Sequence, residues 1–521
     1  MYWRLIDMAM LSETVGYGIL FVYWAVMIAI TLVMTRREDK STREGFLVAR
    51  RQIGWLHGGP SIAASWIWAG ALFVATQMAY QQGLAGLFWF LFPNVLALLI
   101  YVWLGPKIRE RFNHGFTLPQ YIRHKMGDGL AHKAYLVPFF FGQLIAITFN
   151  ISAGAFVFSY ITGIDFVVLV PLLALIPLTY TVISGIKASI VTDVVQMGAI
   201  IGCVLLIVPW AVSQGGGMEA LEGGLQGIQK IPNMLDPGVA FSFGIVTSIG
   251  LISQTISDQQ YWQRVFSIKK REIPKAFIFG AALFALVPLL LSALGFMAAN
   301  PALGIALPAG VDPSLIGVEV VTKLLPAWVA ILFMVALVSG LTSTIDSAIS
   351  AASSLWVADC MKNSKEENEL IASEIEGSSI AASDSDVLLG LEKRAINEGR
   401  LAMAGITVLG VIVAFAAHFI AGFGLNQLFL LSISIAASIS VPTVLSLHYD
   451  RLSAKGVLAG VLGAIIIGMP LFIYANYINN AALTVAASVF MLGFSTACCV
   501  LMPRMEKFWA GWENYINKSK W

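Results

Sequence analysis

The stretch "SGLTSTIDSAISAASS", Ser339–Ser354, lies inside one of the longest apolar tracts of the chain. It is rich in Ser and Thr and carries one carboxylate, Asp346. Residues three or four positions apart share one face of a helix. The residues on one such stripe are Ser339, Ser343, Asp346, Ser350 and Ser353. Close packing of membrane helices explains small polar residues, but a carboxylate at membrane depth is costly and usually functional.

The composition around this stretch predicts an all-α polytopic membrane protein. The chain has 521 residues, of which 58% are hydrophobic and 12% charged, whereas a soluble domain is about 25% charged. A bilayer span needs about 20 apolar residues. We expect thirteen transmembrane helices in a single transporter domain, 1–521. The apolar tracts are centred near residues 24, 69, 96, 148, 174, 200, 250, 287, 342, 409, 435, 465 and 491.

The distribution of Lys and Arg predicts the topology, because cytoplasmic loops carry the excess of these residues. The first loop, "TRREDKSTREGFLVARR", is therefore expected inside. Alternation of thirteen spans leaves only Arg4, Lys230 and Lys323 of 32 basic residues outside. We expect a multi-pass protein of the cell membrane, in a bacterium the inner membrane, with the N-terminus outside and the C-terminus cytoplasmic. The segments expected outside are 1–14, 164–166, 214–237, 301–325, 422–424 and 477–481.

Two spans carry residues that a lipid-facing helix would avoid. These are "GGPSIAASWIWAGAL" (58–72) and the segment 244–264, with its polar run of Ser, Gln and Thr. Interrupted membrane helices must be buried in protein, and a pair of them in corresponding halves points to a transporter's binding site. They are spans two and seven, so the sequence predicts two inverted five-helix repeats, spans 2–6 and 7–11, in a core over 56–448. The acidic segment 361–400 is expected to be a cytoplasmic loop that is flexible or partly helical.

Hydroxyl and carbonyl oxygens suit hard cations such as sodium. A second intramembrane acid, Asp193, lies in "SGIKASIVTDVVQ" (184–196). Asp258 stands near the membrane edge in "SDQQYWQR" (257–264), and we interpret it as a structural or gating residue beside Arg264.

These motifs, in this order, together resemble the sodium:solute symporter family, whose fold is the five-plus-five inverted repeat of the leucine transporter. The resemblance implies broken first and sixth core helices. It also implies a main sodium site made by backbone carbonyls and two hydroxyls. The residues at the matching positions are Ala64, Ile67, Gly340, Ser343 and Thr344.

Some members of that family hold a second sodium. The matching positions here are Asp193, Asp346 and Ser347, with Ser343 shared. An aspartate at 346 departs from the family's usual small or hydroxyl residue. Three roles stay open for it: strengthening the second site, accepting a proton, or pairing with a cationic substrate.

Within the family, "ASWIWAGALFVATQMAYQQGLAGLFWF" and "DQQYWQR" look most similar to the urea-transporter branch. The bulky indole of Trp66 would shrink the cavity and favour a compact solute, and its N–H could donate to a carbonyl. Ordinary packing and interhelical bonds are the alternative roles for these residues. The expected substrate-binding residues are Trp66, Trp68, Gln77, Gln143, Asn150 and Gln254. The expected gating or structural residues are Asp258, Gln259, Tyr261 and Arg264.

The sequence therefore predicts a sodium-coupled secondary active symporter that imports a small polar solute, with urea or a urea-like compound favoured, by alternating access. An amino acid, a sugar or a cationic solute are alternative substrates, and a passive solute channel is an alternative of another class. We expect no enzymatic activity and no organic cofactor. The expected partners are the solute, sodium and the lipid bilayer, with no nucleic acid and no obligatory protein partner.

Overall fold

The computed structural model describes residues 11–127, 129–307, 312–361, 382–419, 425–450 and 452–518, with side chains at 69–70, 382–385, 425–431 and 504–518 left out. Over these ranges the regular structure is helical, apart from one isolated bridge between Ile53 and Ile268. The α-helices are α1 (Glu13–Met34), α2 (Arg37–Ser41), α3 (Arg43–Val48), α4 (Trp55–Trp66), α5 (Ala69–Leu99), α6 (Tyr101–Arg111), α7 (Leu118–Met126), α8 (Leu130–Thr162), α9 (Phe166–Ser184), α10 (Ile186–Gln214), α11 (Met218–Glu222), α12 (Pro237–Val239), α13 (Ile245–Ile256), α14 (Gln259–Ser267), α15 (Ile273–Ala299), α16 (Ile316–Leu324), α17 (Val329–Leu355), α19 (Ala382–Phe419), α20 (Leu425–His448), α21 (Ala454–Gly463), α22 (Met469–Tyr477) and α23 (Ala481–Lys518). The 3₁₀ and π turns are η3 (Ala49–Arg51), η4 (Ala240–Gly244), η5 (Lys270–Glu272), η6 (Pro301–Leu303), η7 (Pro313–Leu315), η8 (Trp356–Cys360) and η9 (Ala464–Gly468).

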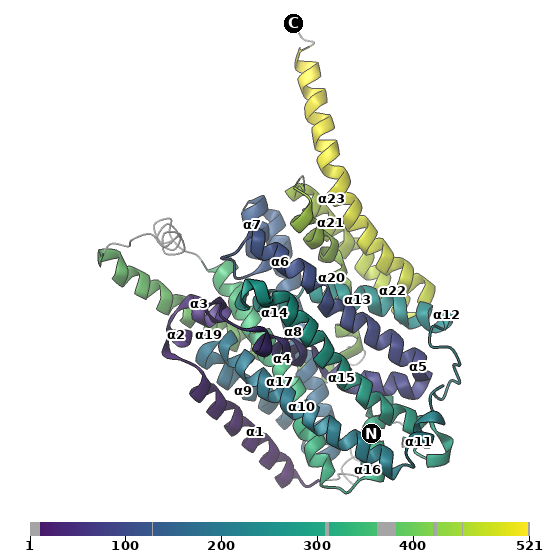
Figure 1. The fold of residues 1–521 in the computed structure, drawn as a ribbon. Coiled ribbons are helices and arrows are strands. Elements are labelled where there is room, and N and C mark those ends of the chain that lie inside the picture. Colours follow the sequence, from purple (N-terminus) through teal and green to yellow (C-terminus); the bar gives the residue numbers. More distant parts are fainter. Residues whose placement is uncertain are drawn as a thin grey trace.

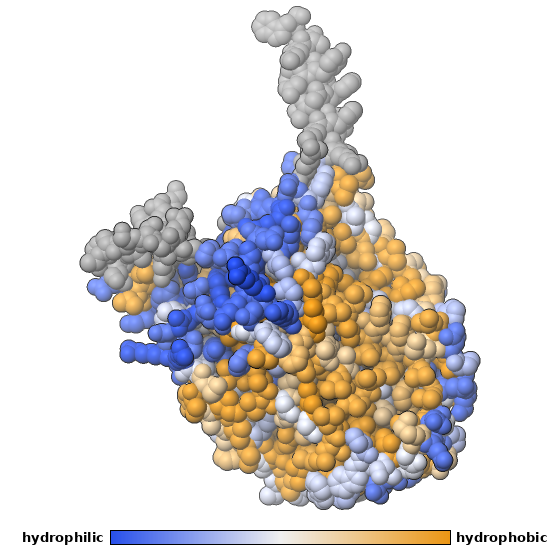
Figure 2. Space-filling view, in the orientation of Figure 1, coloured by the Kyte–Doolittle hydropathy of each residue, from blue (hydrophilic) through white to orange (hydrophobic). Residues whose placement is uncertain are grey.

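The outer surface of the helix bundle is apolar. Large hydrophobic side chains such as Phe21, Val33 and Val137 are more than half exposed. Figure 2 shows a broad hydrophobic band, bounded by a hydrophilic patch over α2, α3 and α7 on one side and a smaller one near α11 on the other. An exposed apolar surface of this extent suits contact with lipid, so the chain is a multi-pass membrane protein.

In the described part of the chain, 11 helices are long and apolar enough to span a membrane. The predicted spans near residues 69 and 435 account for the difference from thirteen. Near 69 the chain forms the short α4 and the beginning of α5, and near 435 the shorter apolar stretch 432–448 is described. The count of thirteen spans therefore stays a prediction.

The first predicted interruption is present within 58–72, beyond the Gly-Gly-Pro run. Pro60 lies within α4, and the helix ends at Trp66, before the non-helical Ile67 and Trp68. Gly59 serves close packing instead, because a Cβ there would stand 2.5 Å from the ring of Phe279 on α15. The break thus falls in the "WIWA" segment. Beyond it, α5 bends at Gly83, whose φ of 62° favours glycine.

The second interruption lies at Ser257 and Asp258, between α13 and α14. Asp258 is extended and caps α14, since its side chain accepts a hydrogen bond from the backbone N–H of Gln260. The chain entering α4 and the chain leaving α14 lie side by side, because Ile53 N–H donates to Ser267 O (3.2 Å) and Lys269 N–H donates to Ile53 O (2.9 Å). The N-terminal end of α4 and the C-terminal end of α14 are therefore tied together.

Helix α17, which carries the hydroxyl-rich stretch, runs through the middle of the bundle (Figure 1). Every residue from Ala336 to Leu355 is buried. The helix packs against α4, α8, α9, α10 and α19. Its hydroxyl face and its apolar face are therefore both covered by protein.

The acidic segment 361–400 is helical in its second half, in agreement with the prediction that it is flexible or partly helical. Residues 362–381 lie outside the described part of the chain, but from Ala382 onward the segment is already α19. The N-terminal ten residues with Arg4, and the predicted external turn 422–424, also lie outside it.

Candidate functional site

The end of α4 meets the middle of α17 at the position predicted for the main sodium site. The hydroxyl of Thr344 donates to Ser65 O (3.2 Å) and Gly340 O (3.3 Å). A Cβ on Gly340 would stand 3.0 Å from the carbonyl oxygen of Ile67. Glycine therefore lets α17 approach the frayed end of α4. The described contacts bring Ile67, Gly340 and Thr344 together.

The remaining members of that set lie in the same region. The carbonyl of Ala64 accepts from Ile67 N–H (3.1 Å), and the hydroxyl of Ser343 donates to Asp193 Oδ1 (2.6 Å). Frayed helix carbonyls and neutral hydroxyls are the ligands that transporters use for sodium. The chemistry of this oxygen set fits such an ion.

The predicted second sodium set is also assembled, but a side chain from α14 enters it. Arg264 donates through Nη2 to Asp193 Oδ2 (2.9 Å) and to Ser347 Oγ (2.7 Å), and through Nε to Ser61 Oγ (2.9 Å). Both partners of this ion pair are fully buried. The guanidinium thus ties α14 to α4, α10 and α17 at once. Asp258, which the sequence placed beside Arg264, bonds instead to Gln143 and Gln260.

Asp346 occupies a separate position in the same cluster. Its carboxylate accepts from Tyr180 OH (2.7 Å), Ser189 Oγ (2.6 Å) and Ser347 Oγ (3.2 Å). Ser189 and Ser347 connect it to the Arg264–Asp193 pair. Among the described side chains, no Lys, Arg or His makes a hydrogen bond or ion pair to Asp346.

A small chamber of about 40 Å³ lies between the two breaks. It is lined by Ser65, Trp66, Trp68, Ile145, Ala146, Phe149, Asn150, Gln254, Asp258, Gln260, Tyr261 and Thr344. A water molecule needs about 10–15 Å³ of such space. The chamber therefore has room for a solute of about three to four water-sized atoms. Four of the six predicted substrate residues line it.

The other two predicted residues lie elsewhere. Gln143 stands at the chamber's edge, where its amide donates to Asp258 Oδ1 (3.0 Å). Gln77 does not line the chamber but a second, wider cavity.

Three polar atoms of the chamber-lining residues have no hydrogen-bond partner among the described residues. They are Trp66 Nε1, Gln260 Oε1 and Tyr261 OH, and all three are buried. The indole of Trp66 meets the ring of Tyr261 edge-on, with centroids 5.5 Å apart. Buried polar groups are normally hydrogen-bonded, so these two donors and one acceptor are unsatisfied groups on residues of the chamber wall.

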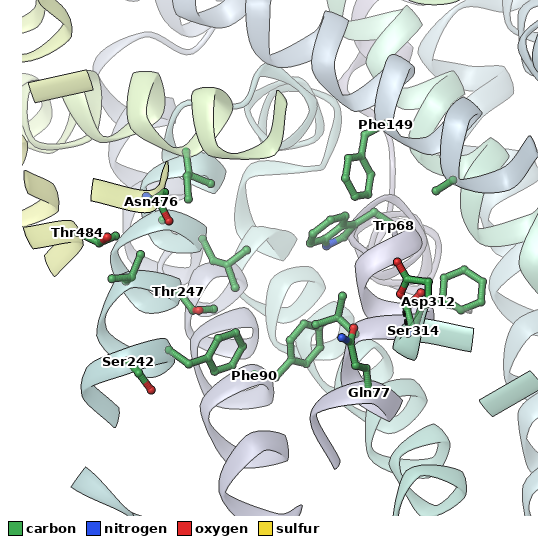
Figure 3. Close-up of a pocket in the computed structure, with 18 of the residues that line it drawn as sticks. Trp68, Gln77, Phe90, Phe149, Ser242, Thr247, Asp312, Ser314, Asn476 and Thr484 are labelled. Carbon is green, nitrogen blue, oxygen red and sulfur yellow. Dashed lines mark hydrogen bonds between the residues drawn. The ribbon is translucent and has the colours of Figure 1, made fainter. Parts of the chain in front are cut away.

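The wider cavity, which we call the vestibule, has a volume of about 630 Å³. Trp68 and Phe149 line both cavities, with ring centroids 5.3 Å apart, so they form the partition between vestibule and chamber. Figure 3 shows these two rings together, with Asn476 and Thr484 on one side and Asp312 and Ser314 on the other. Asp312, Ser314 and Asn479 belong to segments predicted to be external.

The opposite end of the broken helices is closed. All residues of α14 are buried. Gln259 donates to Phe116 O (2.9 Å), and Gln263 donates to Leu47 O (2.8 Å) and Ser350 Oγ (3.2 Å). The structure is therefore open on the side of the predicted external segments and sealed on the other.

The sequence did not predict Gln260 as a site residue, and it predicted gating or structural roles alone for Asp258 and Tyr261, although all three line the chamber. Ser65 and the apolar residues Ile145, Ala146 and Phe149 line the chamber as well and were not predicted. Asp258 caps α14 and therefore fixes the direction in which that helix begins. In "SDQQYWQR" an aspartate follows the polar run, and aspartate is a typical N-cap residue of a helix. This signal places Gln260 and Tyr261 in the first turn of the next helix, beside the break.

Two broken helices stand around a small chamber, with the vestibule on one side and the buried α14 on the other, and this arrangement is typical of secondary transporters of small solutes. The model of the sodium:solute symporter family matches residues 46–381. The chain belongs to that family and is a secondary symporter, not an enzyme.

Solved structures share the fold. A sodium-coupled sialic acid symporter, in a substrate-bound outward-open state, aligns with a TM-score of 0.71 at 19% identity, over 93% of this chain and 97% of that chain. MhsT in complex with L-phenylalanine aligns with a TM-score of 0.52 at 15% identity, over 87% and 99%. The fold is therefore the leucine-transporter type that the sequence predicted.

Curated relatives include urea transporters. A probable urea active transporter of Schizosaccharomyces pombe is 23% identical over 311 residues, which cover 55% of this chain and 46% of that protein. The urea active transporter of Saccharomyces cerevisiae is 23% identical over 303 residues, covering 54% and 41%. A urea–proton symporter of Oryza sativa is 21% identical over 502 residues, covering 89% and 66%. The match thus spans about half the length of the two yeast proteins.

Proposed function

We propose that this protein is a sodium-coupled symporter that imports urea or a close analogue of urea. The observation that carries the proposal is the chamber between the two breaks, which is small and offers unpartnered buried polar atoms. Its position beside Thr344, a residue of the predicted sodium site, supports coupling of the solute to an ion.

The chamber's chemistry complements a planar diamide. The carbonyl oxygen of urea accepts hydrogen bonds, so it can accept one from the N–H of Trp66 and one from the hydroxyl of Tyr261. The amino groups of urea are hydrogen-bond donors, so they can donate to Gln260 Oε1 and to the carboxylate of Asp258. A sugar or a typical amino acid has more atoms than a chamber of about 40 Å³ holds. The size and the polarity therefore both favour the smaller solute.

Sodium would act by holding α4 and α17 together. Thr344 lines the chamber and also bonds to Ser65 O of α4. A cation that binds the carbonyls of the α4 end and the hydroxyls of α17 would fix this wall before the solute enters. One charge moving through 100 mV releases about 2.3 kcal/mol, and a tenfold solute gradient costs about 1.4 kcal/mol. One sodium thus supports more than tenfold accumulation of urea.

Two alternatives have specific observations in their favour. The rice relative is described as a proton symporter, so a proton is the alternative coupling ion. Asp258 in the chamber wall is a carboxylate, so a small cation such as guanidinium is the alternative solute. A passive channel fits less well, because the inner end is sealed by the buried α14.

Uptake of radiolabelled urea into proteoliposomes tests the proposal. We expect an inward sodium gradient to drive accumulation, and replacement of sodium by choline to abolish it. A pH gradient alone should drive none. Accumulation driven by the pH gradient without sodium would show that the coupling ion is a proton. Uptake of guanidinium but not of urea would show that the solute is a small cation. Preloaded unlabelled urea should accelerate entry of labelled urea, which a channel would not show.

A further inference from the structure

The vestibule has a composition that neither the chamber nor the coupling site explains. Its lining includes the aromatic side chains Trp68, Phe73, Phe90, Phe149, Phe156 and Phe243. Its volume of about 630 Å³ is far greater than that of the chamber. A small polar solute passing to the chamber does not need an aromatic surface of this extent.

Charge on the vestibule wall has one sign. Asp312 is the one charged residue among the described residues that line it. It is exposed, and one of its carboxylate oxygens, Oδ1, accepts the backbone N–H of Ser314 (2.8 Å). The polar remainder of the lining is neutral, and consists of Gln77, Ser242, Thr247, Ser314, Asn476, Asn479 and Thr484.

Aromatic faces and a carboxylate attract the same class of ligand. The face of an aromatic ring is electronegative and binds cations, quaternary ammonium groups in particular. The apolar rings also favour a ligand with an organic body. An organic anion would meet the carboxylate, and a strongly hydrated metal ion would gain little from the rings.

We propose that the vestibule is a binding site for monovalent organic cations with an aromatic body, and that its occupation blocks access of the solute to the chamber. Trp68 and Phe149 form the partition to the chamber, so a ligand resting on them covers the entrance. The ligand is larger than the transported solute and remains in the vestibule.

Benzyltrimethylammonium is a suitable probe, with N,N-dimethylbenzamide as the neutral comparison and benzenesulfonate as the anionic one. Binding is measured as a rise in the unfolding temperature of the purified protein, which does not depend on the identity of the transported solute. We expect the cation to stabilise the protein and the neutral and anionic compounds to have much weaker effects. Equal stabilisation by the neutral compound would contradict the proposal.

Asp312→Asn is the first variant. Asparagine caps a helix turn as well as aspartate, so this change removes the charge and retains the local structure. We expect the affinity for the cation to fall by about fivefold, the effect of one exposed charge near the ligand. The matched control is Asp165→Asn, because Asp165 is also an exposed cap, of α9, and does not line the vestibule. An equal loss in both variants, or none in either, would overturn the assignment.

Phe90→Leu is the second variant, since leucine fills space without an aromatic face. We expect a loss of about twofold to fivefold in affinity for the cation. In proteoliposomes the cation should inhibit solute uptake by the wild-type protein and inhibit Asp312→Asn less, while uptake without the cation is equal in the two. Entry of radiolabelled benzyltrimethylammonium itself would overturn the proposed block. Failure of uptake in both proteins without the cation would concern the proposed function and leave the binding result valid.

Discussion

The two ends of the broken helices contrast sharply. At one end, α13 and the beginning of α5 line the vestibule, where aromatic rings and neutral polar groups face open space. At the other end, α4 from Gly58 onward and all of α14 are buried. The side chains of α14 make hydrogen bonds to α3, α4, α10, α13 and α17 and to Phe116 in the segment between α6 and α7.

This difference indicates which movement transport requires. Opening the end covered by α14 requires breaking the bonds of Gln259, Gln263 and Arg264. Closing the vestibule brings together a surface of aromatic and mostly neutral polar side chains. Arg264 is the charged residue among these three, and a buried charge that loses its partner is strongly destabilising. The end covered by α14 is thus held closed by hydrogen bonds and an ion pair, and the vestibule end is open.

Arg264→Ala removes the guanidinium that links α14 to α4, α10 and α17, and it should have the largest effect on stability and uptake. It leaves Asp193 buried without its cation, and removal of one partner of a buried pair costs about 3–5 kcal/mol. We expect a large drop in the unfolding temperature of the purified protein and loss of uptake. Arg111→Ala is the control, since Arg111 pairs with Asp450 at an exposed site, where such pairs contribute about 0–1 kcal/mol.

A second variant isolates the pairing from the loss of the side chain. Arg264→Ala combined with Asp193→Asn should recover part of the lost stability, because the unpaired charge is gone. No recovery in the double variant would show that the guanidinium stabilises the protein through its serine contacts and packing instead.

The Ser343→Ala/Thr344→Ala double variant tests the junction of α4 and α17. We expect the sodium concentration for half-maximal uptake to rise by about tenfold or more, since each oxygen that binds a charged group contributes about 1.5–3 kcal/mol. Ser353→Ala serves as the control, because Ser353 is buried on the same helix but lies outside the predicted sodium set. An equal response of the two variants would remove the sodium site from this junction.

Tyr261→Phe should have the smallest effect of the three. It removes one hydroxyl and retains the ring against Trp66. We expect KM for urea to rise by about fivefold, the value of one hydrogen bond, with sodium affinity unchanged. Tyr101→Phe is the comparison, because its hydroxyl donates to Thr255 O away from the chamber. That variant should lose stability and retain its KM; an equal change of KM in both would contradict a direct role for Tyr261.

The sequence predicted the class of fold correctly because each membrane helix has a local signal in the sequence. That signal is a long apolar run, and an interruption of the run marks a broken helix. The sequence predicted that two spans are broken, and the first break does fall within 58–72, where the backbone opens at Ile67 and Trp68. It did not say which residues of that segment leave the helix, and the Gly-Gly-Pro run serves helix packing. Bulky residues at a break give no local signal, because the break is stabilised by contacts with α17.

The candidate site was predictable only where a motif supplied it. The residues of the main sodium set gather as the family resemblance implied. The pairing of Arg264 with Asp193 was not predicted, because the two residues are distant in sequence and the direction of α14 depends on the extended backbone at Asp258. Gln77 was assigned to the substrate and lines the vestibule, since the phase of a helix after a break cannot be read from periodicity.

The most direct test of the central claim, that sodium and urea bind together at the two breaks, is the unfolding temperature of the purified protein with urea in sodium chloride and in choline chloride. Urea is kept at concentrations too low to denature. We predict a rise with urea in sodium that is absent in choline and absent in the Ser343→Ala/Thr344→Ala variant. An equal rise in both salts, or in the variant, would contradict the coupling of the chamber to a sodium ion.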